Sequence, residues 1–494
     1  MAQGQSGGLR YILAICLVAA LGGILFGYDT AVISGAIDSI TQHFDLSPTM
    51  KGWAVSSVVI GSIIGAGMAG WLANVLGRRL AMQLAAVLFL ISALGSALAF
   101  SFWFYILLRV VGGMAVGITS LVSPMYMGEL APQHWRGRVL SMFQQCIVIG
   151  QTVVFFVNYL IARDVTSAWL ADAGWRWMLG SEAIPALVFG LLLLLVPESP
   201  RWCVMNNQID RARRIFKRFN SERDSEEMID QIRESLQGGQ ASGRRAMNQQ
   251  RRSERRESRS AIRRPIMIGI TALGIFVAAA QQFTGINVVM YYAPTVLSNV
   301  TDSTGSALLQ TGYIGIVFIF GNLAGMLLID RAGRRRLLSI GSLLCVASMA
   351  VLGSVFWLGI QGYLAMFCIM LFVIGFSISW GVCSWTLLGE IFPNAIRGTA
   401  MAWAMAANWA AGFIVAQTFP MMRGSEWLNV LFNGAFPFWL FGALTLVSLV
   451  ITWRFVPETK GVPLESMESL MREKFKRGHI HDYQAYRDSD SATT

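Results

Sequence analysis

Apolar runs of about twenty residues recur along almost the whole chain, and each is long enough for a helix to cross a ~30 Å hydrocarbon core. A transmembrane barrel would instead show alternating segments of about ten residues. We count twelve such runs, so the pattern predicts twelve transmembrane helices. The runs begin near Tyr11, Trp53, Leu80, Phe104, Val139, Trp177, Ile266, Thr311, Leu337, Tyr363, Ala400 and Val430.

Polar stretches divide the twelve runs into two sets of six. The linker between the sets contains two short helical patterns, at 209–219 and 225–236, and the tail contains another at 464–475. The predicted fold class is an all-α membrane protein made of two six-helix bundles. The expected divisions are a bundle at 1–196, a cytoplasmic linker at 197–264, a bundle at 265–456 and a cytoplasmic tail at 457–494.

The two predicted bundles are related by an internal duplication. A fourteen-residue cassette occurs at 124–137 and again, 261 positions later, at 385–398. Gly-Arg-Arg occurs at 77–79 and again at 333–335, and Pro-Glu occurs at 197–198 and again at 457–458. In transporters built from two repeats the substrate site usually lies between the repeats near the bilayer midplane. We therefore expect a central site of this kind.

Composition and charge placement agree with a membrane protein. Only 14% of the residues are charged, against about 25% in soluble domains. The net charge is +11, and the basic residues gather in one set of alternate loops, including nine arginines between 244 and 264. This asymmetry follows the positive-inside rule and predicts cytoplasmic termini for a multi-pass protein of the cell (inner or plasma) membrane. It also argues against nucleic acid as the partner.

The sequence contains no arrangement typical of an enzyme. The six cysteines and four histidines show no metal-ligand or disulfide-framework spacing. There is no nucleophile–base pair and no phosphate-binding loop. We therefore expect no enzymatic activity, no cofactor and no metal.

Three charged residues lie inside apolar runs of the first half: Asp29, Arg109 and Glu182. A charge at the bilayer centre costs roughly 2.5–3.5 kcal/mol on insertion scales, so such residues pair or line a wet cavity. One arginine with two carboxylates predicts a proton-coupling cluster. A fixed structural ion pair, or a position close to the membrane surface, is the alternative.

Amides are concentrated at the start of the second half, in the run QQFTGINVVMYY at 281–292. Gln281, Gln282 and Asn287 both donate and accept hydrogen bonds, as sugar hydroxyls do. Tyr291 shares a helix face with Asn287, and Gly285 could allow the helix to bend. The alternative role for these amides is hydrogen bonding between packed helices.

Other spans add residues that would suit a sugar. Gln144 and Gln151 are seven positions apart and lie on one helix face. Trp385 and Trp409 could supply flat apolar walls for a sugar ring, and Asn408 an additional amide.

The repeated cassettes and the Gly-Arg-Arg motifs combine acidic and basic residues at predicted helix ends. Such charges could form networks that hold one conformation and break in another. The alternative is that the arginines only fix topology. The candidate lock residues are Arg78, Glu129, Arg136, Arg334, Glu390 and Arg397.

Taken together, these motifs resemble those of the sugar porter family of the major facilitator superfamily, and the resemblance covers nearly the whole chain. FGYDTAVISG at 26–35 is similar to the proton-coupled monosaccharide porters, whereas passive facilitators usually lack an acid at Asp29. The other carrying motifs are GRR at 77–79, PMYMGELAP and RGR within 124–138, PESPR at 197–201, QQFTGINVVMYYAP at 281–294, DRAGRR at 330–335, EIFPNAIRG at 390–398 and PETKG at 457–461.

The resemblance implies a major facilitator fold and assigns roles by position. Proton coupling falls on Asp29 and Arg109, with Glu182 nearby. Phe318 and Val382 depart from the family pattern and leave the choice of sugar open. The implied sugar contacts are Gln144, Gln151, Gln281, Gln282, Asn287, Tyr291, Trp385, Asn408 and Trp409.

The expected function is proton-coupled import of a monosaccharide, such as D-xylose or D-glucose, by alternating access. The alternatives are a passive monosaccharide facilitator, an inositol or polyol–proton symporter, and a membrane sugar sensor. The expected partners are the sugar, the proton and the lipid bilayer, and we expect a monomer.

Overall fold

The computed structural model describes residues 2–131, 135–217, 222–237, 265–298, 304–360, 362–393 and 396–460, together with Val462 and Met471. These residues are almost entirely helical, and no strand occurs among them. The arginine-rich stretch at 244–264 and, apart from Met471, the tail pattern at 464–475 lie outside the described residues.

Twelve helices of the described chain are long and apolar enough to cross a membrane, which confirms the predicted twelve spans and the all-α class. Two of the spans begin at the residues read from the sequence, Tyr11 and Ile266, and the others begin one to ten residues away from the sequence-based starts. The spans are Tyr11–His43, Pro48–Val75, Arg78–Ala97, Phe102–Leu130, Gly137–Ala162, Ser167–Leu195, Ile266–Leu297, Gly305–Ala332, Arg334–Trp357, Leu364–Ile391, Arg397–Arg423 and Phe436–Phe455.

The sequence-based prediction that the last span starts near Val430 is wrong, because the span begins at Phe436. Val430 belongs to a separate short helix, α20 (Glu426–Phe432). Asn433 and Gly434 follow it with φ values of 46° and 79°. Two left-handed residues in succession end a right-handed helix, so the apolar run is divided and the span begins only at Phe436 in α21 (Phe436–Phe455).

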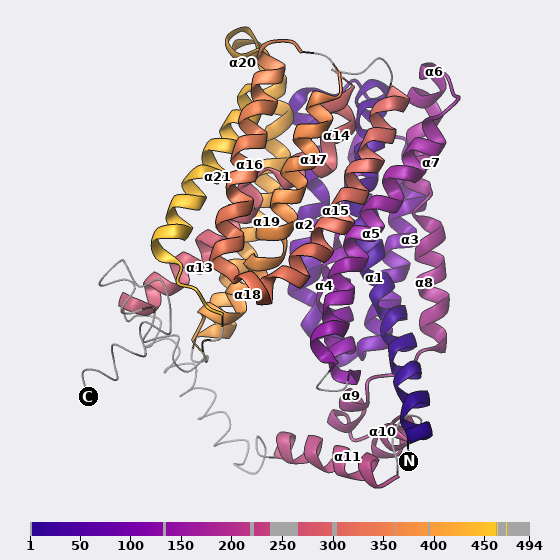
Figure 1. Cartoon of the computed structure of the whole chain (residues 1–494). Helices are drawn as coiled ribbons and strands as arrows, with labels where there is room; N and C mark the ends of the chain where they lie inside the picture. Colours follow the sequence, from indigo (N-terminus) through magenta and orange to yellow (C-terminus); the bar gives the residue numbers. More distant parts are fainter. Residues whose placement is uncertain are drawn as a thin grey trace, which may run out of the picture. The chain divides into compact units, whose positions relative to one another are not determined.

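The described residues form two compact units, one within Met1–Phe44 and Ser57–Glu254 and the other within Asp45–Ser56 and Arg255–Thr494. The first six spans comprise α1 (Ala2–His43), α2 (Pro48–Val75), α3 (Arg78–Ala97), α4 (Phe102–Leu130) and α5 (Arg136–Ala162), followed by α6 (Ser167–Trp169), the π-helical turn η1 (Leu170–Gly174), α7 (Trp175–Gly180) and α8 (Ala183–Leu195) (Figure 1). The other six comprise α13 (Pro265–Phe283), α14 (Ile286–Leu297), α15 (Thr304–Ala332), α16 (Arg334–Trp357), α17 (Leu364–Phe376), the π-helical turn η2 (Ser377–Gly381), α18 (Val382–Ile391), α19 (Arg397–Arg423) and α21.

Helix packing repeats between the two units. In the first, α1 packs on α5, and α3 packs on α4 and α8. In the second, α13 packs on α19, and α16 packs on α17 and α21. These pairs occupy corresponding places in the two sets of six spans, so the duplication read from the sequence is repeated in the packing.

Glycines allow the crossing of α1 and α5 to be close. A Cβ added to Gly27 would lie 1.9 Å from the Ile147 carbonyl oxygen, and one added to Gly150 would lie 2.1 Å from that of Ile24. Small residues at a crossing bring two backbones together, which is how helices associate where apolar burial gives no advantage over lipid.

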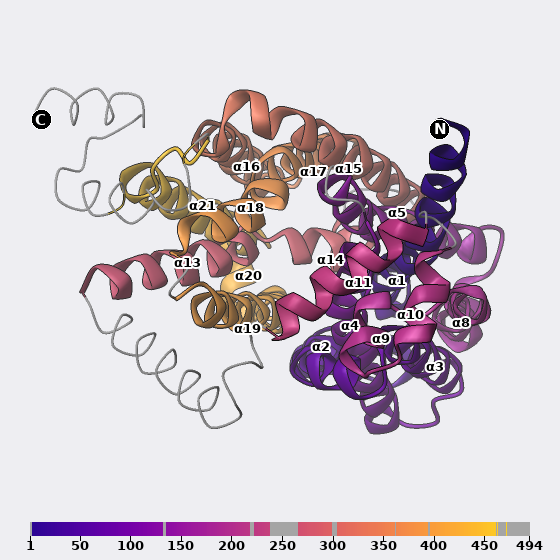
Figure 2. The same ribbon diagram turned by 90° about the horizontal axis from the view of Figure 1, so that it is seen from below.

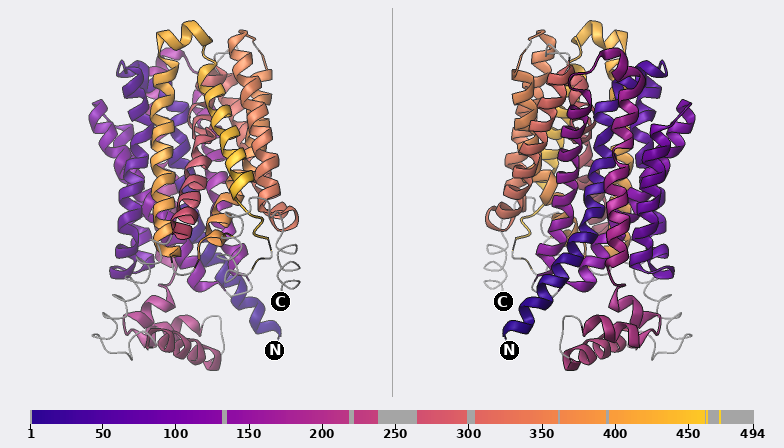
Figure 3. Two further views of the ribbon diagram at one scale, coloured as in Figure 1. Left: turned by 90° about the vertical axis from the view of Figure 1, so that its left-hand side faces the viewer. Right: turned by 90° about the vertical axis from the view of Figure 1, so that its right-hand side faces the viewer.

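Three short helices follow the sixth span: α9 (Pro200–Met205), α10 (Ile209–Phe216) and α11 (Glu222–Gln237). The last two confirm the helical patterns read from the linker. Together they bury a small core that includes Trp202, Cys203, Phe216 and Ile229. Figures 2 and 3 show this group at one end of the long helices of the first unit.

Glycines with positive φ precede α3 and α16. Gly77 has φ 96° and Gly333 has φ 86°. At Gly77 an added Cβ would lie 2.3 Å from a Glu198 carboxylate oxygen, and at Gly333 it would lie 2.5 Å from one of Glu458. Each glycine therefore lets a carboxylate reach the first N–H groups of the helix that follows.

We expect Gly77→Ala to lower the thermal unfolding temperature of the purified protein. The backbone at Gly77, with φ 96° and ψ 165°, is open almost only to glycine and costs another residue about 1–3 kcal/mol. The added Cβ would also displace Glu198. Gly70→Ala is the control, because an added Cβ there meets nothing within 4 Å. Equal unfolding temperatures for the two variants would contradict this role of Gly77.

Candidate functional site

A buried ion pair joins α1 and α4 within the first unit. An Arg109 guanidinium nitrogen lies 2.6 Å from a carboxylate oxygen of Asp29, and a second donates to the Asp29 backbone carbonyl at 3.0 Å. The two residues are 1% and 0% exposed. The structure therefore places two of the three predicted coupling residues in direct contact.

Glu182 completes this cluster. It lies in the break between α7 and α8, is 1% exposed, and interacts electrostatically with both Asp29 and Arg109. Within the described part of the chain, one Asp29 carboxyl oxygen (Oδ2) and one Glu182 carboxyl oxygen (Oε1) are buried without a hydrogen-bond partner. Two adjacent carboxyls, each with an unused oxygen, can hold one proton between them.

The wall of the cluster leaves little room around Asp29. A Cβ added to Gly112 of α4 would lie 3.1 Å from Asp29 Oδ1 and 2.4 Å from Ser92 Oγ. Tyr105, one turn before Arg109, is completely buried. Sequence reasoning missed Gly112 and Ser92 because a small residue in an apolar run carries no signal of its own.

A chain of amide hydrogen bonds runs through the second unit. Asn287 Nδ2 donates to Gln282 Oε1 at 2.7 Å, and Gln282 Nε2 donates to Asn408 Oδ1 at 3.2 Å. Asn408 Nδ2 donates to Gln281 Oε1 at 2.9 Å, and Gln281 Nε2 donates to the Trp380 carbonyl at 2.9 Å. The structure thus brings together four of the predicted sugar-binding residues, from α13, α14 and α19.

Breaks in two spans make this chain possible. Gly285, with φ 92°, separates α13 from α14, as the sequence suggested. Trp380 lies in the π-helical turn η2, is completely buried, and donates from Nε1 to Ser342 Oγ at 2.9 Å. Sequence reasoning missed Trp380 because sixteen tryptophans gave no reason to choose it.

The members of the amide chain differ in exposure. Gln281 and Asn408 are each 5% exposed, whereas Gln282 and Asn287 are half-buried. Tyr291 is buried at 6% exposure. The other predicted contacts in this unit, Trp385 of α18 and Trp409 of α19, are half-buried, as are Gln144 and Gln151 of α5 in the first unit.

A charge network closes the end of the first unit that carries α9–α11. The Arg78 guanidinium donates to both Glu129 oxygens, at 2.8 to 3.2 Å, and to the Ala73 carbonyl at 3.0 Å. Ser199 Oγ donates to Glu129 at 2.5 Å. Glu198 caps α3 by accepting from the backbone N–H of Arg78 at 2.9 Å and of Arg79 at 3.2 Å.

The second unit has the same network. Arg334 contacts Glu390 at 2.9 Å and donates to the Ile329 carbonyl at 3.1 Å. Thr459 Oγ1 donates to Glu390 at 2.5 Å, in the place of Ser199. Glu458 accepts from the backbone N–H of Arg334 at 2.9 Å and caps α16. Asp330 gives Arg334 a further carboxylate at 3.2 Å.

Two predicted lock residues are placed differently. Arg397 donates from Nε to the Phe392 carbonyl at 3.1 Å, and one of its terminal nitrogens is buried without a partner in the described part. The side chain of Arg136 lies outside the described residues. The central role of Glu198 and Glu458 was missed, although their repeated Pro-Glu pairs were visible.

Known proteins are similar to this chain in sequence and in fold. The profile of the family described as "Sugar (and other) transporter" matches residues 15–471. The chain is 39% identical to the D-xylose-proton symporter of Escherichia coli K12, covering 94% of this chain and 97% of the relative. It is 34% identical to the arabinose-proton symporter of Bacillus subtilis, covering 94% and 96%. It is also 34% identical to the glucose facilitated diffusion protein of Zymomonas mobilis, covering 96% and 100%.

Solved structures agree with these relatives. The inward open conformation of the xylose transporter XylE from E. coli superimposes with a TM-score of 0.80 at 38% identity, covering 93% of this chain and all of that one. The same symporter bound to 6-bromo-6-deoxy-D-glucose gives a TM-score of 0.71 at 39% identity, covering 94% and 100%. With the duplicated units, the charge networks and the family profile in agreement, the chain belongs to the sugar transporter family of the major facilitator superfamily, and it is a multi-pass membrane protein.

Proposed function

We propose that this protein imports a monosaccharide together with a proton by alternating access. The observation that carries the proposal is the Asp29–Arg109–Glu182 cluster, which is buried inside membrane-spanning helices. The relatives include symporters for D-xylose and arabinose and a glucose facilitator. The choice between coupled and passive transport therefore rests on this cluster.

Charge balance favours a proton at this cluster. With both carboxyls ionised, Arg109 leaves one uncompensated negative charge in a buried site, which is costly. A proton shared by Asp29 and Glu182 removes that charge and supplies a donor for their unused oxygens. A membrane potential of about 100 mV gives roughly 2.3 kcal/mol per proton, enough for about 50-fold accumulation.

The amide chain is the proposed sugar site. Gln282 and Asn287 are half-buried, so their amide groups can exchange the hydrogen bond between them for bonds to sugar hydroxyls. Gln281 and Asn408 are buried and hold Gln282 in place. Tyr291, Trp385, Trp409, Gln144 and Gln151 are proposed as further contacts, with the aromatic rings against the sugar ring.

The sugar is proposed to be a pentose or hexose. The amide donors and acceptors suit several arrangements of hydroxyl groups. The residues therefore indicate the class of sugar but do not select one stereoisomer. A counterflow panel in proteoliposomes with D-xylose, L-arabinose, D-glucose, D-galactose and inositol would identify the substrate. Exchange of inositol alone would favour a polyol porter.

Asp29→Asn should abolish uphill accumulation of sugar while counterflow exchange remains, because the amide cannot release a proton. Accumulation in proteoliposomes under an imposed proton gradient measures this. Asp38→Asn is the matched control, since Asp38 lies on the exposed face of the same helix. If Asp29→Asn still accumulates sugar, Asp29 is not the coupling acid. The residue that couples sugar to the proton must then lie elsewhere, and Asp29 cannot distinguish a symporter from a passive facilitator.

Gln282→Ala and Asn287→Ala should each weaken sugar binding about tenfold, because a buried polar partner left unpaired costs about 1–3 kcal/mol. Gln281→Ala should weaken binding to a similar degree and also lower the unfolding temperature, since Gln281 holds Asn408 and the Trp380 carbonyl. Trp385→Ala should weaken binding through lost ring packing. Titration calorimetry measures the affinities.

Gln310→Ala is the control for these variants. Gln310 is a glutamine of the same unit, it is as buried as Gln281, and its amide donates to Ser306. Wild-type affinity in all three amide variants would reduce the amide chain to helix packing and remove the proposed site.

The paired networks are proposed to bias the resting conformation. Arg334→Ala should remove the contact with Glu390 and increase labelling of a cysteine introduced on the cytoplasmic side. Arg397→Ala should act in the same direction, through loss of its bond to the Phe392 carbonyl. Arg336→Ala is the control, because Arg336 is exposed beside the network. Labelling equal to wild type in folded Arg334→Ala would leave the networks a purely structural role.

A further inference from the structure

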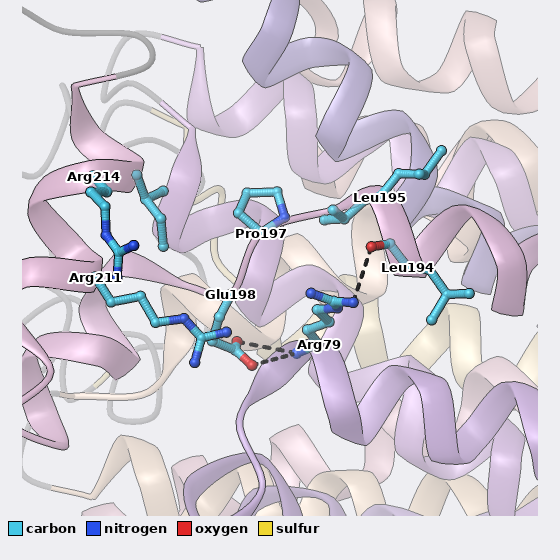
Figure 4. A pocket seen from close by; sticks show the side chains of 9 residues that line it. Arg79, Leu194, Leu195, Pro197, Glu198, Arg211 and Arg214 are labelled. Atoms are coloured by element: carbon cyan, nitrogen blue, oxygen red, sulfur yellow. Dashed lines mark hydrogen bonds between the residues drawn. The ribbon is translucent and has the colours of Figure 1, made fainter.

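A cavity of about 340 Å³ lies in the first unit, and none of its lining residues belongs to the carboxylate cluster or the amide chain. It is formed where the ends of α3 and α8 meet α10 (Figure 4). Arg79 comes from α3, while Arg211 and Arg214 come from α10. Leu194 to Glu198 form the remaining wall, together with Ile215.

The lining carries excess positive charge. Three arginines face one glutamate, Glu198, whose carboxylate is 3% exposed and already accepts backbone hydrogen bonds from Arg78, Arg79 and Ser199. Burial raises the pKa of this carboxyl above its ordinary value, while its backbone hydrogen bonds and the nearby Arg211 act in the opposite direction. No Arg–Glu198 ion pair within 4 Å occurs among the described side chains that line it.

The arginines retain unused donors. One terminal nitrogen of Arg79 donates a hydrogen bond to the Leu194 carbonyl at 3.0 Å, and the Arg79 Nε is buried without a partner in the described chain. Arg211 donates to Gln208 at 3.2 Å and Arg214 to the Asp210 carbonyl at 3.4 Å. Each guanidinium has five N–H groups, so most remain available for the oxygen atoms of an anion.

Apolar side chains flank the cavity on the membrane side. Leu194 and Leu195 end the sixth span and are 57% and 78% exposed. Leu80, next to Arg79 on the packed helix α3, is 51% exposed. A soluble anion would gain nothing from these leucines, whereas a ligand with both a phosphate and hydrocarbon chains would contact leucines and arginines together.

We propose that this cavity binds the phosphate group of an anionic phospholipid, with the acyl chains along Leu80, Leu194 and Leu195. Arginine forks match phosphate oxygens in pairs. The arginine-rich loops predict that this end of the unit is cytoplasmic, and that leaflet carries the anionic lipids that attract basic residues. This site goes beyond sugar transport and does not depend on it.

The test is lipid titration of the full-length protein in a nonionic detergent, followed by native mass spectrometry. Dioctanoyl phosphatidylglycerol should bind at least tenfold more tightly than dioctanoyl phosphatidylcholine. Arg211→Gln and Arg214→Gln should each weaken binding of the anionic lipid about fivefold, and the double variant more. Arg201→Gln is the control, because Arg201 is exposed on the neighbouring helix α9 and does not line the cavity.

Equal binding of the two lipids would overturn the proposal, as would wild-type binding by the double variant or an equal loss in Arg201→Gln. Inorganic phosphate and glycerol 3-phosphate separate the two sources of a phosphate group. If either binds as tightly as the lipid, the cavity takes a soluble phosphate and the assignment to lipid is wrong. Circular dichroism checks that each variant is folded.

Discussion

Polar groups within a membrane have no water to bond with, so each must find its partner inside the protein, and the pairing of Arg109 with Asp29 is the strongest case of this constraint here. Removing Arg109 would leave the two buried carboxyls without a positive charge beside them. The same requirement explains why the amides of the second unit bond to one another and to a backbone carbonyl. In both units the groups that we propose for transport therefore also hold helices together.

The sequence predicted the number of spans, the duplication and the grouping of Asp29 with Arg109. Each of these can be recognised from the order of the residues alone. Run length gives a span, repeated motifs give a duplication, and a charge in an apolar run needs a partner. The family resemblance indicated which amides to group, and the structure places Gln281, Gln282, Asn287 and Asn408 in one hydrogen-bonded chain.

Apart from the bend at Gly285, the sequence did not predict where helices break or which backbone groups accept the side-chain hydrogen bonds. The end of α20 depends on two left-handed residues, and the acceptor for Gln281 is the carbonyl of Trp380 in a π-helical turn. Neither is encoded by hydrophobic periodicity. The sequence placed Glu390, Arg397 and Arg334 in one predicted network. In the structure Glu390 contacts Arg334 from another span, whereas Arg397 bonds to the Phe392 carbonyl. Sequence separation within a motif does not determine which residue a long side chain reaches.

The caps of α3 and α16 come from different kinds of segment. Glu198 is followed by the well-packed helices α9 and α10, whereas Glu458 and Thr459 lie only a few residues beyond the last membrane span. The second network is therefore completed by the segment that leaves the final helix. A truncation or a fused reporter at the carboxyl end should begin no earlier than after Lys460, because a cut at the end of the last span would remove the cap of α16.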